Sequence, residues 1–213
     1  MTKRPSLLVV TGPDGAGKST LCRNLIARLE QEGLKVREVS IWDGLAEVDG
    51  LSFRSKADVM RYLGSLGPGE SIARVYFLFH AMAVALERAL RPSVGADLLL
   101  VNGYWYKYAV SELGYGMDWE KIRAIAAAFP VPDWVFYLSV SPQSAAGRKD
   151  SVSAYESGSS QDFVEFQRTL RRYWERLRND LASDARWIEV SGEQSEAAVL
   201  EQVARKIGEV LPR

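Results

Sequence analysis

The sequence predicts an α/β fold in which a five-stranded, mainly parallel sheet carries helices on both faces. Short apolar runs alternate with segments whose apolar residues recur at helical spacing, and the strands of a parallel sheet need such helical connections. The first, third and fourth runs are apolar throughout, as expected of strands that are buried on both faces. No repeat or low-complexity linker interrupts the chain, so residues 1–213 are expected to form a single domain.

The expected strands end in glycine or polar residues, which mark the start of a connection. The carboxyl ends of parallel strands meet at one edge of the sheet, where ligands are expected to bind. Asp43 follows the second run and Asn102 ends the third, so both are expected at that edge. The runs are SLLVVTG, KVREVSIW, DLLLVN, DWVFYLSV and RWIEV.

Apolar residues three and four positions apart predict helices between these runs. A long helix is expected over residues 70–90, with His80 in the core, and the arginines between 168 and 178 are interpreted as the solvated face of another helix. Residues 149–160, KDSVSAYESGSS, are polar and lack periodicity, which predicts a mobile segment. Further helices are expected over 18–33, 55–63, 107–113, 119–129 and 163–181, and from 195 onward.

The composition favours a small-molecule partner. Lys plus Arg equal Asp plus Glu, 27 of each, so no overall basic field indicates nucleic acid or an anionic membrane. Cys22 is the single cysteine, which excludes an internal disulfide framework and fits a reducing compartment. Because the N-terminal MTKRPS lacks the apolar core of a signal peptide, a cytoplasmic location is expected.

Residues 9–20, VVTGPDGAGKST, place a glycine-rich turn and a lysine between an expected strand and an expected helix. The turn satisfies G-x-x-x-x-G-K-[ST] in the context that this motif requires. Glycines let amide hydrogens point inward, and the start of the helix adds the positive end of its dipole, so the concavity fits a polyphosphate. Lys18 is expected on the outer phosphates and the Ser19 hydroxyl on Mg²⁺. The expected nucleotide-binding residues are Gly12, Pro13, Asp14, Gly15, Ala16, Gly17, Lys18, Ser19 and Thr20.

A phosphate cradle alone does not define a reaction. A GTPase switch is disfavoured because D-x-x-G after a strand and N-K-x-D near the base site are both missing. A motor ATPase would have an acid at the end of an apolar run, whereas the third run ends in Asn102. Small-molecule kinases, catalytically weakened nucleotide-binding proteins and other partner-coupled NTP hydrolases therefore stay open, with a kinase favoured.

The chain resembles the thymidylate kinase family of nucleoside monophosphate kinases over nearly its whole length. The segments that carry the resemblance are GPDGAGKST, LLLVNGY, PDWVFYLSVSP, AAGRK and IEVSGEQS. The resemblance implies a P-loop kinase fold, a homodimer, and transfer of the terminal phosphoryl group of ATP to a nucleoside monophosphate with Mg²⁺. It also implies that Asp14 is a carboxylate near the acceptor, that Arg148 opens the lid segment at about 149–160, and that 191–195 lie near adenine.

The chain departs from that family where phosphate-binding cations are expected. Asn102, Gly103 and Tyr104 stand where the family has Asp-Arg-Tyr, Met82 falls near the position of a helix arginine, and the lid segment has no arginine. An arginine that acts on transition-state charge can change a rate by orders of magnitude. Either the acceptor is unusual or other cations substitute, and the candidates are Arg54, Lys56, Arg61, Arg74, Lys107, Arg148 and Lys149.

Asp43 offers an alternative acceptor chemistry. A kinase of a free hydroxyl needs a base that a phosphate acceptor does not need, and Asp43 is expected at a strand end where such a base could lie. Asp43 is equally compatible with capping a turn before Gly44. The expected catalytic residues are thus Lys18, Asp14, Asp43 and Arg148. Acceptor binding is assigned to Asp43, Phe77, Asn102 and Tyr104, with Trp42 and Trp105 as further stacking candidates.

Overall fold

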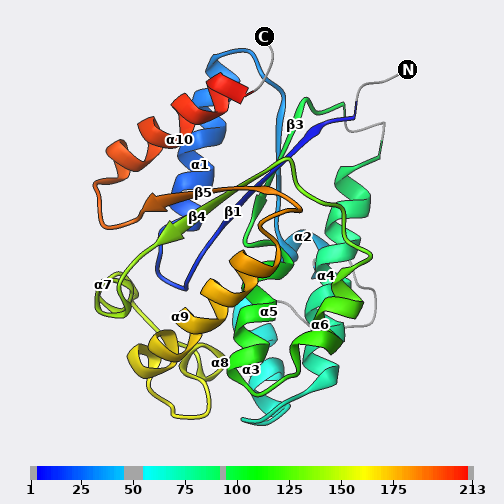
Figure 1. Ribbon diagram of the computed structural model, residues 1–213, viewed down its shortest axis with the longest axis vertical. Coiled ribbons are helices and arrows are strands. Elements are labelled where there is room, and N and C mark those ends of the chain that lie inside the picture. The colour runs from blue at the N-terminus through cyan, green and yellow to red at the C-terminus, as the bar shows by residue number, and fades with distance from the viewer. Residues whose placement is uncertain (1–3, 46–54, 92–94, 211–213) are drawn as a thin grey trace.

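β1 (Ser6–Thr11) lies at the centre of the sheet in the computed structural model, which describes residues 4–45, 55–91 and 95–210. The sheet has five strands in the order β2-β3-β1-β4-β5, and every pairing is parallel (Figure 1). The predicted α/β fold class is confirmed. The other strands are β2 (Val36–Val39), β3 (Leu98–Asn102), β4 (Trp134–Ser139) and β5 (Arg186–Ser191).

Successive residues of the central strands feed two separate cores, because side chains of a strand alternate between the faces of a sheet. Leu7 and Val9 join the core on one face, whereas Leu8 and Val10 join the core on the other. All four side chains are fully buried, which accounts for the continuous apolar run. Cys22 lies in the second core with no exposed surface, in agreement with a packing role.

Helices cover both faces of the sheet (Figure 1). On one face lie α1 (Lys18–Gln31) and α10 (Glu196–Val210), whose apolar residues form the second core with the strands. The opposite face carries α4 (Ile72–Ala89), α5 (Tyr104–Gly114), α6 (Trp119–Ala126) and α9 (Phe163–Asp180). The other helices of the described residues are α2 (Ile41–Leu45), α3 (Lys56–Ser65), α7 (Pro142–Gly147) and α8 (Ala154–Ser157).

Two expected segments differ from the structure because serine caps start helices there. Ser40 ends the second strand region by opening α2, so β2 is shorter than the run KVREVSIW. In the polar segment 149–160, Ser153 and Glu156 form a capping box that begins α8. The expectation of a wholly irregular segment is therefore wrong for 154–157, and its mobility stays a prediction.

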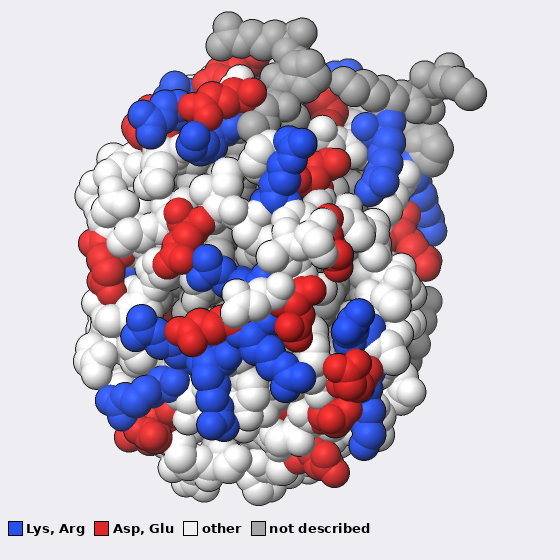
Figure 2. Space-filling view, viewed as in Figure 1, with Lys and Arg blue, Asp and Glu red and all other residues white. Residues whose placement is uncertain are grey.

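The arginines of α9 form a solvated face, as the sequence predicts. Figure 2 shows basic side chains gathered around α9, with acidic side chains among them. Arg168 pairs with Glu165, and Arg178 with Glu189 of β5 at 2.9 Å. Because acids offset these cations, the face does not form an uncompensated basic patch.

His80 is exposed on α4, so its expected place in the core is wrong. Within the described ranges, no helix has the length and apolar character needed to cross the hydrocarbon core of a bilayer.

Arg74 and Glu112 form a buried ion pair that joins α4 to α5. The Arg74 Nε lies 3.0 Å from both carboxylate oxygens of Glu112, and neither side chain is exposed by more than 1%. The guanidinium also donates to the carbonyl oxygens of Gly67 and Gly69. The Tyr155 hydroxyl donates to Glu112 at 3.0 Å, which ties the lid segment to the same pair. Arg74 is therefore structural, and its candidacy as an acceptor-binding cation is wrong.

Glu112→Gln should lower the free energy of unfolding by about 3 kcal/mol, because it leaves the buried guanidinium without a countercharge. Urea unfolding followed by circular dichroism measures the difference. Glu120→Gln, at an exposed position of α6, is the matched control and should leave the midpoint unchanged. Equal midpoints for both variants would contradict the structural role of the pair.

Candidate functional site

The turn between β1 and α1 is an open cradle whose shape requires glycine. Gly12, Gly15 and Gly17 have φ of 142°, 79° and 92°, which side chains disfavour. A Cβ at Gly12 would lie 2.4 Å from the Leu138 carbonyl oxygen, and one at Gly15 would lie 2.4 Å from that of Ala145. No side chain caps the start of α1, so its first N–H groups and positive dipole end are available to an anion.

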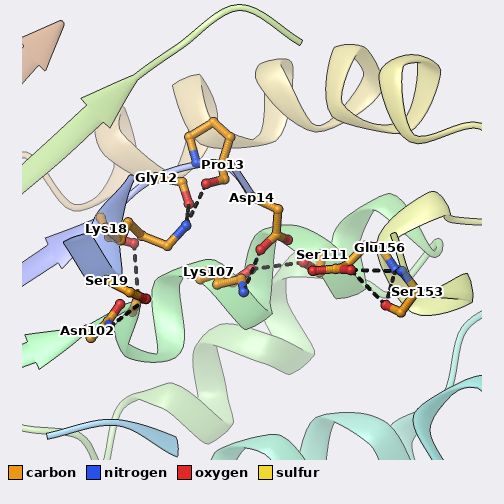
Figure 3. Close-up of polar contacts among 12 residues, drawn as sticks. Gly12, Pro13, Asp14, Lys18, Ser19, Asn102, Lys107, Ser111, Ser153 and Glu156 are labelled. Atoms are coloured by element: carbon orange, nitrogen blue, oxygen red, sulfur yellow. Dashed lines mark hydrogen bonds and ion pairs between the residues drawn. The ribbon is translucent and has the colours of Figure 1, made fainter. Parts of the chain in front are cut away.

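Lys18 is held against this turn by main-chain oxygens (Figure 3). Its Nζ donates to the carbonyl oxygens of Gly12 at 3.0 Å and Pro13 at 2.5 Å, and the residue is 8% exposed. Burial, followed by repulsion from Lys107, lowers the pKa of Lys18 to about 7. The charge of Lys18 is therefore sensitive to an anion at this position.

Asp14 and Lys107 form an ion pair beside Lys18. The Asp14 Oδ1 lies 2.7 Å from the Lys107 Nζ, at the first turn of α5 (Figure 3). Burial opposes ionisation of Asp14, but the ammonium groups of Lys107 and Lys18 hold its pKa well below the usual range. Burial also disfavours the Lys107 charge, and Asp14 reverses that effect and raises the Lys107 pKa. Both groups are thus ionised at neutral pH.

A second ion pair lies in the lid segment. The Lys149 Nζ is 2.6 Å from the Glu156 Oε1, while the other oxygen of Glu156 accepts from the Ser153 N–H and hydroxyl at 2.9 Å each. Burial and the charge of Asp14 raise the Glu156 pKa, but these hydrogen bonds and Lys149 lower it overall. The acid is therefore ionised and tied to its own segment.

These charged groups line one cavity of about 690 Å³ at the carboxyl ends of the strands. The cradle residues 14–21 form its middle, together with Asn102 and Gly103 after β3. Polar residues at one end include Asn24, Gln194 and Ser195. At the other end an apolar and aromatic wall is made by Trp42, Val59, Met60, Leu63, Tyr108 and Tyr155. The cavity can thus hold a polyphosphate with a different organic group at each end.

Asn102 links the cradle to β2. Its Nδ2 donates to the Ser19 Oγ at 3.1 Å and to the Glu38 Oε1 at 3.3 Å. Hydroxyl, amide and carboxylate oxygens are the donors that a hard divalent cation prefers, so the Ser19 environment fits Mg²⁺. Among the described residues, no three His, Cys, Asp or Glu side chains gather as a metal cluster.

Most expected nucleotide-binding residues come together in this cavity. Asp14 to Thr20, Asn102 and Arg148 all line it, whereas Gly12 and Pro13 contribute the carbonyl oxygens that hold Lys18. The expected loop near adenine contributes Gly192, Gln194 and Ser195. The structure thus brings the P-loop residues Asp14 to Thr20 and Arg148, which precedes the lid segment, to one cavity.

Asp43 does not reach the cavity. Its carboxylate accepts from the Ser40 N–H at 2.7 Å and from the Ser40 hydroxyl at 3.1 Å, so it caps the first turn of α2. Ser40, Ile41 and Trp42 line the cavity, but Asp43 is not part of its wall. The assignment of Asp43 as acceptor-binding base is therefore corrected in favour of the capping interpretation.

Tyr104 and Phe77 also lie outside the cavity wall. Tyr104 is completely buried, and its hydroxyl donates to the Pro130 carbonyl oxygen at 2.5 Å. Phe77 packs its ring 4.9 Å from that of Tyr62. The assignment of Tyr104 to acceptor binding is wrong because its ring is buried in the core, whereas that of Phe77 stays a prediction. Trp42, which is 36% exposed, and Tyr108 are aromatic residues that do line the cavity.

The substitute cations proposed from the sequence have different fates. Lys56, Lys107, Arg148 and Lys149 line the cavity. Arg61 pairs with Asp58 at 3.1 Å on the exposed side of α3. Arg54 lies outside the described residues. Lys107 could have been favoured from its sequence position, because it follows Gly103, which stands where the family has arginine, by four residues and so lies on the same helix face.

Comparison with known proteins supports the resemblance. A family model described as "AAA domain" matches residues 1–101. Thymidylate kinase of Exiguobacterium sp. is 25% identical over 80% of this chain and 83% of its own. The thymidylate kinase of Pelodictyon phaeoclathratiforme is 24% identical over 97% of both chains, and that of Danio rerio is 25% identical over 84% of this chain and 79% of its own. The chain is thus similar to thymidylate kinases over most of its length, and its parallel sheet and phosphate cradle agree with a P-loop kinase fold.

Proposed function

We propose that this protein transfers the terminal phosphoryl group of ATP to a nucleoside monophosphate or a similar nucleoside-like molecule. The observation that carries the proposal is the convergence of Lys18 and Lys107 on Asp14 in one cavity. Ammonium groups around a glycine-rich turn can neutralise the phosphates of the nucleotide on one side of the transferred group and that of the acceptor on the other. The names of the similar proteins support the same class of acceptor.

The nucleotide would occupy the cradle and the polar end of the cavity. The open start of α1 and Lys18 would hold its phosphates, and Gln194 and Ser195 lie where its base would extend. Ser19 would hold Mg²⁺, with Asn102 and Glu38 nearby. When bound, the cation neutralises charge on the phosphates.

In the proposed reaction, an acceptor phosphate oxygen attacks the terminal phosphorus of ATP. The new P–O bond forms as the bond from that phosphorus to its bridging oxygen breaks, and ADP leaves with the electron pair. A phosphate oxygen is already ionised, so no proton has to be removed by a base. Lys18 would stabilise charge on the transferred group, and closure of the lid segment would exclude water.

A phosphate acceptor fits the site better than a free hydroxyl. Asp43 is engaged by Ser40, and Asp14 is ionised beside two ammonium groups, which makes it a weak base. The alternative is a nucleotide-binding protein with weakened catalysis. It is favoured by the ion pairs of Lys107 and Lys149, which engage two cations that a kinase would use on phosphates. Homodimer formation and a cytoplasmic location stay predictions of the family resemblance and the composition.

Lys18→Ala should lower acceptor-dependent ADP release by about 100-fold or more, because it removes a buried donor to the transferred group. The assay uses purified protein, ATP, Mg²⁺ and a panel of nucleoside monophosphates and nucleosides. Lys121→Ala, at an exposed position of α6, is the control and should retain the parent rate. Parent-like turnover by the Lys18 variant would refute the assignment, whereas tight ATP binding without turnover by the parent would identify the non-catalytic alternative.

ATP binding should take up a proton at pH 8. Lys18, with a pKa of about 7 in the empty site, is then mostly neutral, while bound phosphates favour its charged form. Above pH 7 the affinity should therefore fall as pH rises, by up to about tenfold per unit. Calorimetry in buffers of different ionisation enthalpy measures the uptake. Lys18→Arg keeps the charge at all these pH values and should abolish the uptake, and an unchanged uptake would exclude Lys18 as its source.

Asp43→Asn should change acceptor-dependent turnover by less than about tenfold, equivalent to 1.4 kcal/mol. The asparagine oxygen can still accept from Ser40, so the cap of α2 is largely kept. Steady-state rates with the same panel measure the effect. A loss of several orders of magnitude, without loss of folded protein, would restore the general-base interpretation of Asp43.

A further inference from the structure

The segment after β3 delivers a lysine to the cavity although its first residues offer no cation. Asn102 and Gly103 begin this segment, and Tyr104 points into the core. Lys107, one turn further along α5, brings its Nζ to 2.7 Å from the Asp14 carboxylate. The phosphate cradle thus has a cation opposite Lys18 that comes from a different element.

Backbone contacts at Gly103 fix the position of the first turn of α5, from which the Lys107 side chain extends. The Gly103 N–H donates to the Val10 carbonyl oxygen at 2.8 Å, and the Thr11 hydroxyl donates to the Gly103 carbonyl oxygen at 2.9 Å. These bonds attach the start of α5 to the end of β1, directly before the cradle. A Cβ at Gly103 would lie 3.7 Å from the Lys107 Cδ, so the lysine stem runs alongside this glycine. Lys107 is therefore a positioned side chain rather than a freely moving one.

The single negative charge of Asp14 lies beside two basic side chains, those of Lys18 and Lys107. Lys18 and Lys107 are both close enough to lower the Asp14 pKa, and Lys107 in turn disfavours the charged form of Lys18. One carboxylate thus serves two buried ammonium groups that repel each other. An anion placed between them would offset both the repulsion and the cost of their burial.

Lys107 and Lys149 form ion pairs with acids of different segments, and Lys107 can donate further hydrogen bonds. An ammonium group has three donors, and the contact with Asp14 uses one. The partner of Lys149 is Glu156, which the capping box ties to the lid segment. The partner of Lys107 belongs to the cradle itself, and Lys107 lines the same cavity as the aromatic residues Trp42 and Tyr108.

We propose that Lys107 binds the phosphate of the acceptor, a nucleoside phosphate monoester, and holds it facing the transferred phosphoryl group. The inference rests on the proposed function and names its acceptor-side cation. Lys107 thereby takes the place of the arginine that this chain lacks after β3. Asp14 acts as a positioning residue that keeps the ammonium group charged and directed. The nucleoside part of the acceptor extends toward Trp42, Met60 and Tyr108.

Binding measurements with matched ligands test this role without relying on turnover. Calorimetry compares thymidine, deoxyuridine and deoxyguanosine with their 5′-monophosphates, on the parent, Lys107→Gln, Lys107→Arg and Lys121→Gln proteins. Lys107→Gln should weaken binding of the preferred monophosphate by about 10-fold to 100-fold, the usual effect of losing a hydrogen bond to a charged group. Binding of the matching nucleoside should be nearly unchanged, Lys107→Arg should recover part of the loss, and Lys121→Gln should resemble the parent.

Equal weakening of monophosphate and nucleoside would overturn the proposal, because it would indicate a packing defect rather than a phosphate contact. Parent-like binding by Lys107→Gln, or a parent protein that prefers nucleosides to monophosphates, would overturn it too. ATP–Mg²⁺ binding to the same proteins separates the two levels. If ATP binds and turns over while Lys107 proves dispensable, the proposed kinase function stands and the role of Lys107 fails. If ATP does not bind the folded parent, the proposed function fails as well.

Discussion

The charge balance around Asp14 is the constraint on which the functional part of the molecule depends. One buried carboxylate lies beside the ammonium groups of Lys107 and Lys18, which keep it ionised against the cost of its burial. An isolated buried charge would be neutralised or strongly destabilising, so Asp14 and Lys107 stay charged as a pair, whereas the pKa of Lys18 is lowered to about 7. Positive charge in excess of Asp14 is then concentrated where the backbone already presents the open start of α1. The cavity is in this way prepared for phosphate by its own electrostatics.

The sheet topology makes this charge set possible. β1 lies between β3 and β4, so the cradle that follows β1 meets the connections from both neighbours. The connection after β3 contributes Asn102 to the Ser19 hydroxyl and Lys107 to Asp14. On the other side, close approach of the β4 and α7 backbones leaves no room for a Cβ at Gly12 or Gly15. The same central position thus explains the glycines and the placement of the cations.

The strands and the cradle could be predicted from sequence because they depend on local patterns. Apolar runs, helical periodicity and the spacing from Gly12 to Ser19 are each visible within a few residues. The side chains that were placed wrongly depend on distant or unusual contacts instead. Arg74 finds its partner Glu112 on another helix. Tyr104 has a positive φ of 54° and turns its ring into the core. Asp43 is diverted by Ser40, in a helix too short to show a period. Lys107 is not part of the P-loop motif, because it lies far along the chain and reaches Asp14 only through the position of α5 in the fold.

Lysine in place of arginine changes what the site can do. A guanidinium keeps its charge and a fixed, planar set of donors, whereas an ammonium group is a compact point charge whose pKa responds to burial. The cavity relies on this response, since Lys18 has a pKa of about 7 beside Lys107. Glu156 pairs with Lys149 in the lid segment, while the charge of Lys149 also lowers the pKa of Asp14 and of Lys18. Phosphate binding, charging of Lys18 and release of the lid lysine would then be coupled, because each changes the field that the others feel. Such coupling would make a site built from lysines depend on occupancy more than one built from permanently charged arginines.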